Sequence, residues 1–524
     1  MRGLARYLLP SLADVIFVCL LLAVLAGSGE RLLADCDTGY HVRAGEFMLA
    51  TGTVPRHDIF SFHDPAPRWV AFEWLSQVML ALGHRWHGLD GVVGLSALLP
   101  ALTFCLLYRA LRLRGGSALV AVAVVALAVA TSALHWLARP HLFSLLLTAL
   151  WLGVLEGHRS GRRNRLAWLP PLMLAWVNLH AAFVVGLALI AIYLVGALAR
   201  HLGATGDERA RTRAPLRALS LTLAACGVAA LVNPNGIQAL LHPLASLGSS
   251  FTMGHVGEFR SPDFHDLASA PFALMLLSLI ALLARSDRKP GLEQTLLVVA
   301  FGCLALRSQR HIPFFALVAA PALVDQLDAL LARHRGRAGV DFIERRSRTL
   351  DEVDGAARGH LWIAAAIALA ALLIGGDRLG RGFDVKSTPA AAARFLLAEP
   401  IAGNVFNEYE FGDYLVYSSW PRYRVFIDGR ADMYGEALLR QYYQVARLQP
   451  GWRDVLERYD VDWVLFTADS ALSRALLLDP AWRLVHADPV ANIFARDTAE
   501  NRALIERHPG VEPVPVTGAS NAER

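Results

Sequence analysis

The sequence predicts a polytopic α-helical membrane protein with a small soluble α/β domain near its C-terminal end. Its 524 residues are 55% hydrophobic and only 18% charged, whereas a soluble protein carries about 25% charged residues. The mean hydropathy is +0.40. The apolar residues gather in long runs, and mixed polar and apolar sequence returns only after the last of these runs.

The apolar runs predict about eleven membrane spans, because a spanning helix needs about 20 predominantly apolar residues. They lie near residues 8–29, 89–111, 117–137, 141–157, 166–179, 181–200, 215–233, 269–285, 292–307, 311–331 and 359–376. The first run is interpreted as a retained signal-anchor, since many further runs follow it and no clear cleavage site does. The short run at 166–179 contains two prolines, so a re-entrant pair is an alternative there.

Arginine-rich segments between alternate spans predict the orientation of the chain. Besides Arg2 and Arg6, they occupy residues 109–114, 159–165, 200–217, 285–289 and 333–358. By the positive-inside rule these segments face the cytoplasm. We therefore expect a protein of the bacterial inner membrane with its N-terminus inside and its C-terminal domain outside. The pI of about 9.0 then reflects loop arginine, and no nucleic-acid partner is predicted.

The predicted domains are a membrane domain at residues 1–376, which includes a first outside loop at 30–88, a soluble domain at 377–497 and a flexible tail at 498–524. In the soluble domain, short apolar segments predict strands at 403–406, 423–428, 462–466, 482–486 and 492–495. Helices are expected at 388–397, 435–447, 451–459 and 469–478. The five cysteines form no CxxC pair and predict no disulfide framework.

The first outside loop begins with an acidic motif, Asp35-Cys36-Asp37, directly after the first span. Two carboxylates in such a pattern can bind a divalent ion such as Mg²⁺ or Mn²⁺, or can accept a proton from a hydroxyl group. Aspartate is also a common helix cap, so the same pair could simply begin a helix at Thr38. His41 and Glu73, further along this loop, are additional candidate site residues.

The other outside loops are short but rich in ionisable residues, which are functional candidates at the ends of spans. Single residues of this kind are more often helix caps or interfacial anchors, whereas the whole group favours a site. Arginine is suited to phosphate, because its planar fork donates two parallel hydrogen bonds. Arg139, Arg307, Arg310 and His311 are the predicted phosphate ligands, expected to line a cleft with Asp37, and the remaining candidates are His141, His180, Glu258, Asp263 and His265.

Two segments of the soluble domain, 407–414 and 428–434, combine polar and aromatic residues in a way that suits sugar binding. Asp428-Gly429 is also a common turn signal, and this second interpretation is the stronger one. Acceptor binding or a lid is the expected role of the domain.

An acidic motif after the first span, followed by two interfacial helices and an aromatic-rich stretch, resembles the GT-C superfamily of membrane glycosyltransferases. Protein O-mannosyltransferases and aminoarabinose transferases belong to it. The resemblance implies a polyprenyl-phosphate-linked sugar as donor, and it implies Asp37 as the base with Asp35 as its partner or metal ligand. Thr38 stands where many members have a second acid, so Asp35 would replace that acid or the site would lack a metal.

The predicted function is therefore transfer of a sugar from a polyprenyl phosphate to a lipid, glycan or protein acceptor on the outer face of the membrane. The alternative is a membrane component without catalytic activity, such as a transporter or scaffold of polysaccharide or lipid assembly. A transporter is expected to show ionisable groups in the middle of its spans and paired half-repeats. The sequence shows neither feature, and a scaffold remains open.

Overall fold

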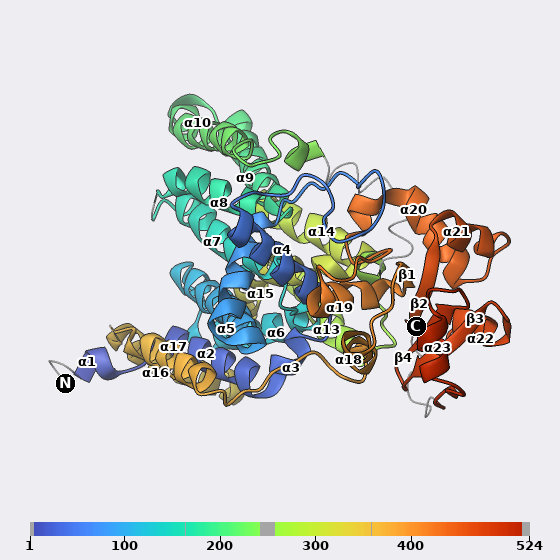
Figure 1. The fold of residues 1–524 in the computed structure, drawn as a ribbon. Coiled ribbons are helices and arrows are strands. Elements are labelled where there is room, and N and C mark those ends of the chain that lie inside the picture. The colour runs from blue at the N-terminus through green and yellow to red at the C-terminus, as the bar shows by residue number, and fades with distance from the viewer. Residues whose placement is uncertain (1–4, 163, 242–256, 358, 516–524) are drawn as a thin grey trace. The chain divides into compact units, whose positions relative to one another are not determined.

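The computed structural model describes residues 5–162, 164–241, 257–357 and 359–515 (Figure 1). Arg2, Arg163 and Arg358, which contributed to the predicted orientation, lie outside this part of the chain. The chain divides into two compact units. The membrane unit comprises Met1–Gly29 and Trp86–Gly380, and the sheet unit comprises Glu30–Arg85 and Arg381–Arg524.

Each of the eleven predicted runs falls on a helix. Six helices of the described residues are long and apolar enough to cross a membrane, or seven if the bent pair at 338–375 is one span. The chain is therefore an integral membrane protein, and the count of eleven stays a prediction. The helices are α1 (Ala5–Leu8), α2 (Leu12–Ala23), α5 (Trp74–Leu113), α6 (Ala118–Ser132), α7 (His141–Arg159), α8 (Leu169–Leu179), α9 (Phe183–Gly203), α10 (Gly206–Ala229), α13 (Ala270–Arg285), α14 (Leu292–Arg307), α15 (Ile312–Arg333), α16 (Ala338–Ala356) and α17 (Leu361–Gly375).

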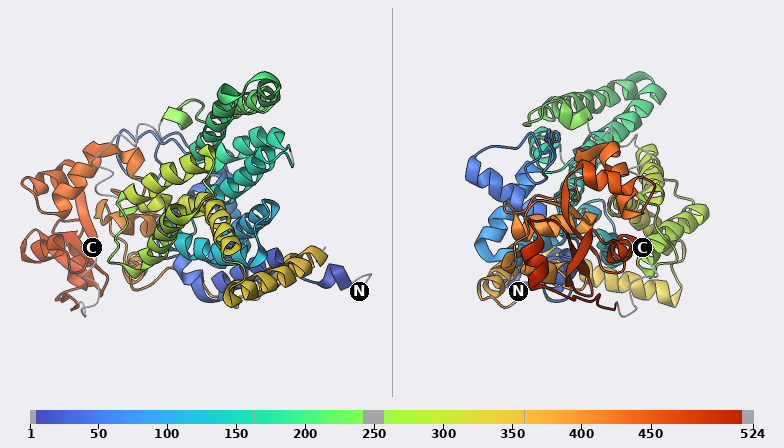
Figure 2. Two further views of the ribbon diagram at one scale, coloured as in Figure 1. Left: turned by 180° about the vertical axis from the view of Figure 1, so that it is seen from behind. Right: turned by 45° about the vertical axis from the view of Figure 1, so that its right-hand side comes forward.

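Helix α15 forms the core of the membrane unit and packs against α6, α13 and α14 (Figure 2). Its alanines Ala316, Ala319 and Ala320 are fully buried. Small residues let neighbouring backbones approach closely, which is how helices associate where the solvent is itself apolar. The alanine-rich sequence of α15 thus fits its central place.

Helix α5 passes from one unit into the other through a kink. At His87 and Gly88 the backbone leaves the helical conformation, and Gly88 has a φ of 54°. Glycine adopts positive φ without a steric penalty. The unit boundary falls next to this kink, so residues 74–85 of the helix belong to the sheet unit.

The sheet unit contains a four-stranded sheet of order β1-β2-β4-β3. Strand β1 (Asn404–Asn407) pairs parallel to β2 (Val461–Thr467), and β4 (Ala491–Arg496) pairs antiparallel to both β2 and β3 (Trp482–Ala487). Its helices are α3 (Gly29–Leu32, at the boundary), α4 (Asp37–Thr51), α18 (Ala390–Ala398), α19 (Tyr409–Ser419), α20 (Ala431–Ala446), α21 (Trp452–Arg458), α22 (Ala471–Leu478) and α23 (Arg502–Arg507).

The first outside loop folds with the C-terminal residues and not, as predicted, with the membrane domain. Helix α4 of the loop packs directly on α19. A Cβ atom added at Gly39 would lie 2.7 Å from Cβ of Tyr417 and 2.8 Å from the carbonyl oxygen of Asp413. Only a glycine allows this close approach, so the sequence of the loop is fitted to the C-terminal domain.

Three features of the sheet unit differ from the predictions. Residues 423–428 are not a strand of the sheet, because Val425 exchanges backbone hydrogen bonds with Phe60 and Phe62 of the first outside loop instead. Helix α19 was not predicted. The predicted flexible tail contains α23 in its described part, where Arg507 pairs with Glu399, and residues 516–524 lie outside the described residues.

Candidate functional site

Three aspartates of the sheet unit come together, and we call Asp37, Asp413 and Asp428 the carboxylate cluster. Asp37 is the first residue of α4, Asp413 lies on α19, and Asp428 follows the extended segment after α19. Gly429 joins them. Its N–H lies 3.0 Å from each carboxylate oxygen of Asp413, and a Cβ added to it would lie 2.4 Å from Oδ1 of Asp37.

The electrostatics of the cluster are unfavourable for full ionisation. Burial, followed by repulsion from Asp37 and Asp428, raises the pKa of Asp413 well above its usual range. Burial and the same three carboxylates also raise the pKa of Tyr409. A carboxyl group held neutral beside ionised ones can keep a proton within the site, as paired carboxyl groups do when like charges lie close together.

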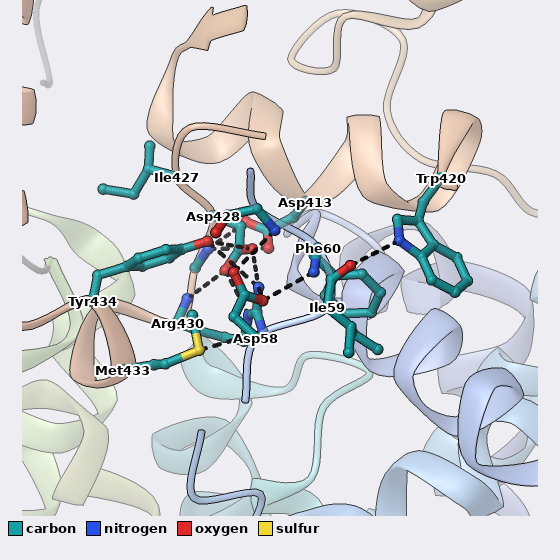
Figure 3. A network of polar contacts seen from close by, with 12 residues as sticks. Asp58, Ile59, Phe60, Asp413, Trp420, Ile427, Asp428, Arg430, Met433 and Tyr434 are labelled. Atoms are coloured by element: carbon teal, nitrogen blue, oxygen red, sulfur yellow. Dashed lines mark hydrogen bonds and ion pairs between the residues drawn. The ribbon is translucent and has the colours of Figure 1, made fainter. Parts of the chain in front are cut away.

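Asp428 also belongs to a buried ion-pair network (Figure 3). Arg430 donates to both oxygens of Asp428, with Nε to Oδ1 at 2.8 Å and a terminal nitrogen to Oδ2 at 2.5 Å. The same terminal nitrogen lies 2.7 Å from Oδ1 of Asp58 in the first outside loop. The Tyr434 hydroxyl donates to Asp428 at 2.9 Å. The side chains of Asp58 and Asp428 are fully buried, and that of Arg430 is 2% exposed.

Aromatic rings surround the Arg430 guanidinium. Its central carbon lies 4.6 Å from the ring centroid of Trp69, 4.9 Å from that of Phe60 and 5.8 Å from that of Tyr40. Such rings attract a cation that water no longer solvates. Although burial alone opposes the charged form, Asp428 and Asp58 raise the pKa of Arg430. The guanidinium is therefore a fixed positive charge beside the carboxylate cluster.

The other residues predicted in the first outside loop have local partners. Asp35 accepts a hydrogen bond from the Asp37 backbone N–H at 2.8 Å. The N-cap residue of α4 is Cys36, which makes no side-chain capping bond. His41 is buried, lies 3.1 Å from the Gln77 amide nitrogen and 3.7 Å from a carboxylate oxygen of Glu73. His41 of α4 and Glu73 thus form a pair.

The metal site predicted at Asp35 and Asp37 lacks a ligand set. Within the described residues, no group of three His, Cys, Asp or Glu side chains is arranged to hold a metal ion. Asp35 Oδ1 accepts the backbone N–H of Asp37. Binding of Mg²⁺ or Mn²⁺ by these two aspartates stays a prediction.

The membrane unit has a cluster of opposite character. Arg139 pairs with Glu258, and the guanidinium of Arg310 lies 4.6 Å from the ring centroid of Phe259. Burial opposes ionisation of Glu258, but Arg139, His135 and Arg310 lower its pKa overall. The side chains of Arg139 and Glu258 are 18% and 25% exposed. Cations outnumber the carboxylate, so this group can accept a further anion.

Histidines extend this group, which we call the arginine–histidine cluster: Arg139, Arg310, Glu258, His135, His141, His180 and His311. His141 Nε2 lies 2.8 Å from the His135 carbonyl oxygen, and the two rings lie 4.7 Å apart. His180 Nδ1 lies 2.9 Å from the Ser144 hydroxyl, and Arg310 and Arg139 are its charged neighbours. His311 has Arg310 and His135 as charged neighbours.

Three predicted residues are placed elsewhere in the membrane unit. Arg307 is exposed at the end of α14, and its carbonyl oxygen accepts from Ser261. Asp263 and His265 are exposed and form a local turn in which Asp263 accepts from the His265 N–H at 2.8 Å. These contacts are those of ordinary loop and helix-end residues.

Sequence reasoning missed Asp58, Asp413, Asp428 and Arg430 as site residues. Asp428-Gly429 is a common turn signal in the sequence. Asp413 lies on a helix that was not predicted. One signal was present, namely that Asp428, Gly429 and Arg430 follow a buried apolar segment without an intervening loop.

The fold of this chain is similar to that of solved oligosaccharyltransferases. The chain matches solved structures of the oligosaccharyltransferase of Archaeoglobus fulgidus. The apo form gives a TM-score of 0.56 at 12% identity, over 89% of this chain and 69% of the other. The enzyme named AglB, in complex with an inhibitory peptide and a dolichol-phosphate, gives a TM-score of 0.58 at 11% identity. This match covers 87% of this chain and 69% of the other.

A third structure, tethered to an acceptor peptide with an NVT sequon, gives 0.58 at 13% identity, over 89% and 70% of the chains. At such low identity the likeness concerns the fold. No known protein-family profile matches the chain, and no characterised protein matches its sequence.

Proposed function

We propose that this protein is a glycosyltransferase of the inner membrane that moves a sugar from a polyprenyl-phosphate donor to an acceptor outside the cytoplasm. The observation that carries the proposal is the carboxylate cluster, in which Asp37 lies against Gly429 beside the buried Asp413. Two of the solved structures with this fold contain a dolichol-phosphate or an acceptor peptide, which supports a lipid phosphate as the leaving group.

The sheet unit supplies the acceptor half of the proposed reaction. The acceptor oxygen or nitrogen attacks C1 of the sugar and gives its proton to a carboxylate oxygen of Asp37, while the bond from C1 to the phosphate oxygen breaks. A positioned base of this kind accelerates a reaction by about 10²–10⁴. Asp413, kept neutral by burial and by its neighbours, limits the negative charge that Asp37 experiences.

The membrane unit supplies the donor half. Arg139 and Arg310 bind the phosphate and stabilise the negative charge that develops on it as the sugar departs. The phosphate would replace Glu258 as partner of Arg139, and His180 and His311 lie beside the arginines as further hydrogen-bonding groups. The lipid phosphate leaves with both electrons of the broken bond, so no covalent enzyme intermediate is needed.

The proposal is tested by comparing cells that carry wild-type protein with cells that carry Asp37→Asn. Envelope lipids, glycans and proteins are profiled by mass spectrometry, and membrane accumulation is measured in parallel. We expect one glycosylated species to disappear in Asp37→Asn at normal accumulation. An unchanged profile would instead support the transporter or scaffold alternative.

The proposed orientation has a separate test. Reporter fusions after Arg114 and after Arg496 should report the cytoplasm and the outside, respectively, because arginine-rich segments favour the cytoplasmic side. Two fusions in one compartment would contradict the orientation.

A further inference from the structure

We propose that Arg430 is a positioning residue that fixes the Asp428–Gly429 segment against Asp37 and Asp413. The inference rests on the proposed function, because it assigns a role in the acceptor half of that reaction. Arg430 lies next in sequence to Gly429, which contacts both carboxylates. The proposed role therefore acts through the backbone of three consecutive residues, 428 to 430.

Several hydrogen bonds and ion pairs hold residues 428 to 430 in place. Arg430 binds Asp428 through two nitrogens and Asp58 through one of them, and its backbone N–H donates to Asp428 Oδ1 at 3.1 Å. Asp58 in turn accepts the backbone N–H groups of Phe60 at 3.0 Å and Ser61 at 2.9 Å. The network thus joins the first outside loop to the C-terminal domain.

Burying the charges of Asp58, Asp428 and Arg430 costs free energy. Three buried charges lose their hydration, which is recovered only when the partners have good geometry. Two carboxylates and one guanidinium also leave the network net negative beside Asp413. A fold that needed only stability could use apolar residues here, since such replacements are often neutral or stabilising. The retained charges indicate that the geometry itself is used.

The backbone of Gly429 lies close against the side chain of Asp37. Its backbone is not in the left-handed region, so an alanine there is conformationally allowed, yet its Cβ would strike Oδ1 of Asp37 at 2.4 Å. The N–H of the same residue donates to Asp413. A displacement of this backbone would therefore move Asp37 and Asp413 together, and small misplacements of reacting groups can cost about 10²-fold in rate.

Arg430→Lys is the primary test, since lysine keeps the charge but cannot donate two parallel bonds to Asp428 and reach Asp58 as well. We expect kcat to fall by between about tenfold and about a hundredfold, with the KM for the polyprenyl-phosphate donor unchanged. The control is Arg453→Lys, which alters an exposed pair with Asp479 and should leave kcat unchanged. Wild-type kcat in Arg430→Lys would overturn the inference.

A second readout does not depend on transfer. Modification of Asp37 by a water-soluble carbodiimide requires the protonated carboxyl, and mass spectrometry gives the pH of half-modification. In Arg430→Lys this pH should rise, because Asp428 loses bonds that neutralise its charge next to the cluster. An unchanged pH of half-modification would contradict the inference, even if the wild-type protein showed no transfer and the proposed function failed.

Gly429→Ala keeps the test open should Arg430→Lys fail to accumulate. This variant leaves Arg430, Asp58 and Asp428 in place and disturbs only the contact with Asp37. We expect normal accumulation and the same fall in kcat, and full activity would overturn the inference. Inactive Asp37→Asn together with fully active Arg430→Lys would refute the positioning role and leave the proposed function intact.

Discussion

The two charged clusters of this protein differ in how their arginines are held. In the sheet unit, Arg430 is enclosed by two buried carboxylates and several aromatic rings. In the membrane unit, Arg139 shares one partly exposed carboxylate with a second arginine nearby. The first arrangement fixes a geometry, whereas the second leaves positive charge for which an incoming anion can compete. In the proposed reaction, the same residue type would fix a position in one unit and bind an exchangeable anion in the other.

The largest effect is expected for Asp37→Asn. Asparagine has nearly the same size as the aspartate at the first position of α4, so folding should be preserved while the proposed proton acceptor is lost. We expect transfer to fall by about 10²–10⁴, measured as acceptor modification in purified membranes. Asp35→Asn is the matched control, because the Asp35 oxygen that accepts the Asp37 backbone N–H is also present in asparagine. Equal losses in both variants would argue against a special role for Asp37.

Removing one partner of the buried ion-pair network around Arg430 should destabilise the protein. Asp58→Ala deprives Arg430 of a partner and leaves the N–H groups of Phe60 and Ser61 without their acceptor. Loss of a partner in a buried pair costs about 3–5 kcal/mol. Thermal unfolding in detergent should show this against Glu436→Ala, whose exposed pair with Arg440 is worth less than about 1 kcal/mol. Similar unfolding temperatures for Asp58→Ala and Glu436→Ala would show that the buried network contributes little to stability.

Changes in the arginine–histidine cluster should alter the affinity for the lipid phosphate instead. Arg310→Lys should weaken binding of polyprenyl phosphate by about one to two decades, because a charge-assisted hydrogen bond contributes about 1.5–3 kcal/mol. Arg307→Lys provides the control, since Arg307 is exposed and lies at the end of α14. Native mass spectrometry measures the affinity of both variants for polyprenyl phosphate. Equal weakening in the two variants would place the phosphate elsewhere.

Glu258→Gln should have a smaller effect of opposite sign. Glu258 competes with a phosphate for Arg139, so its neutral analogue should bind polyprenyl phosphate more tightly by a factor of about two to five. Asp263→Gln, in the same loop but exposed, should leave the affinity unchanged. Weaker binding in Glu258→Gln would show that the carboxylate supports the site rather than competing for it.

A further effect, on stability, concerns pH. Burial, followed by repulsion from Glu410, raises the pKa of Glu408 from 4.5 to about 7. The folded protein then binds the proton more tightly than the unfolded chain, so this contribution to stability is present below pH 4.5 and is lost as the pH rises through about 7. Glu408→Gln should flatten the fall in unfolding temperature between these values. An equal fall in both proteins would refute the assignment.

The membrane unit could be predicted from sequence far better than the carboxylate cluster. Apolar runs have to be helical in a membrane, since every backbone group must be paired, and each predicted run falls on a helix. Asp37 followed from its place after the first span. Asp413 and Arg430 did not, because their role depends on the packing of α4 against α19 and on contacts between distant segments. Local patterns carry no signal for such contacts.

The bond between Asp58 and Arg430 has a consequence for the evolution of this chain. Two residues far apart in the sequence share one buried charge balance, and a change in either leaves the other uncompensated. In related sequences the two positions should therefore vary together, as spatially paired positions do. Because identity to the matched structures is only 11–13%, this joint signature, read together with the glycine at 429, offers a way to recognise relatives that overall similarity would miss.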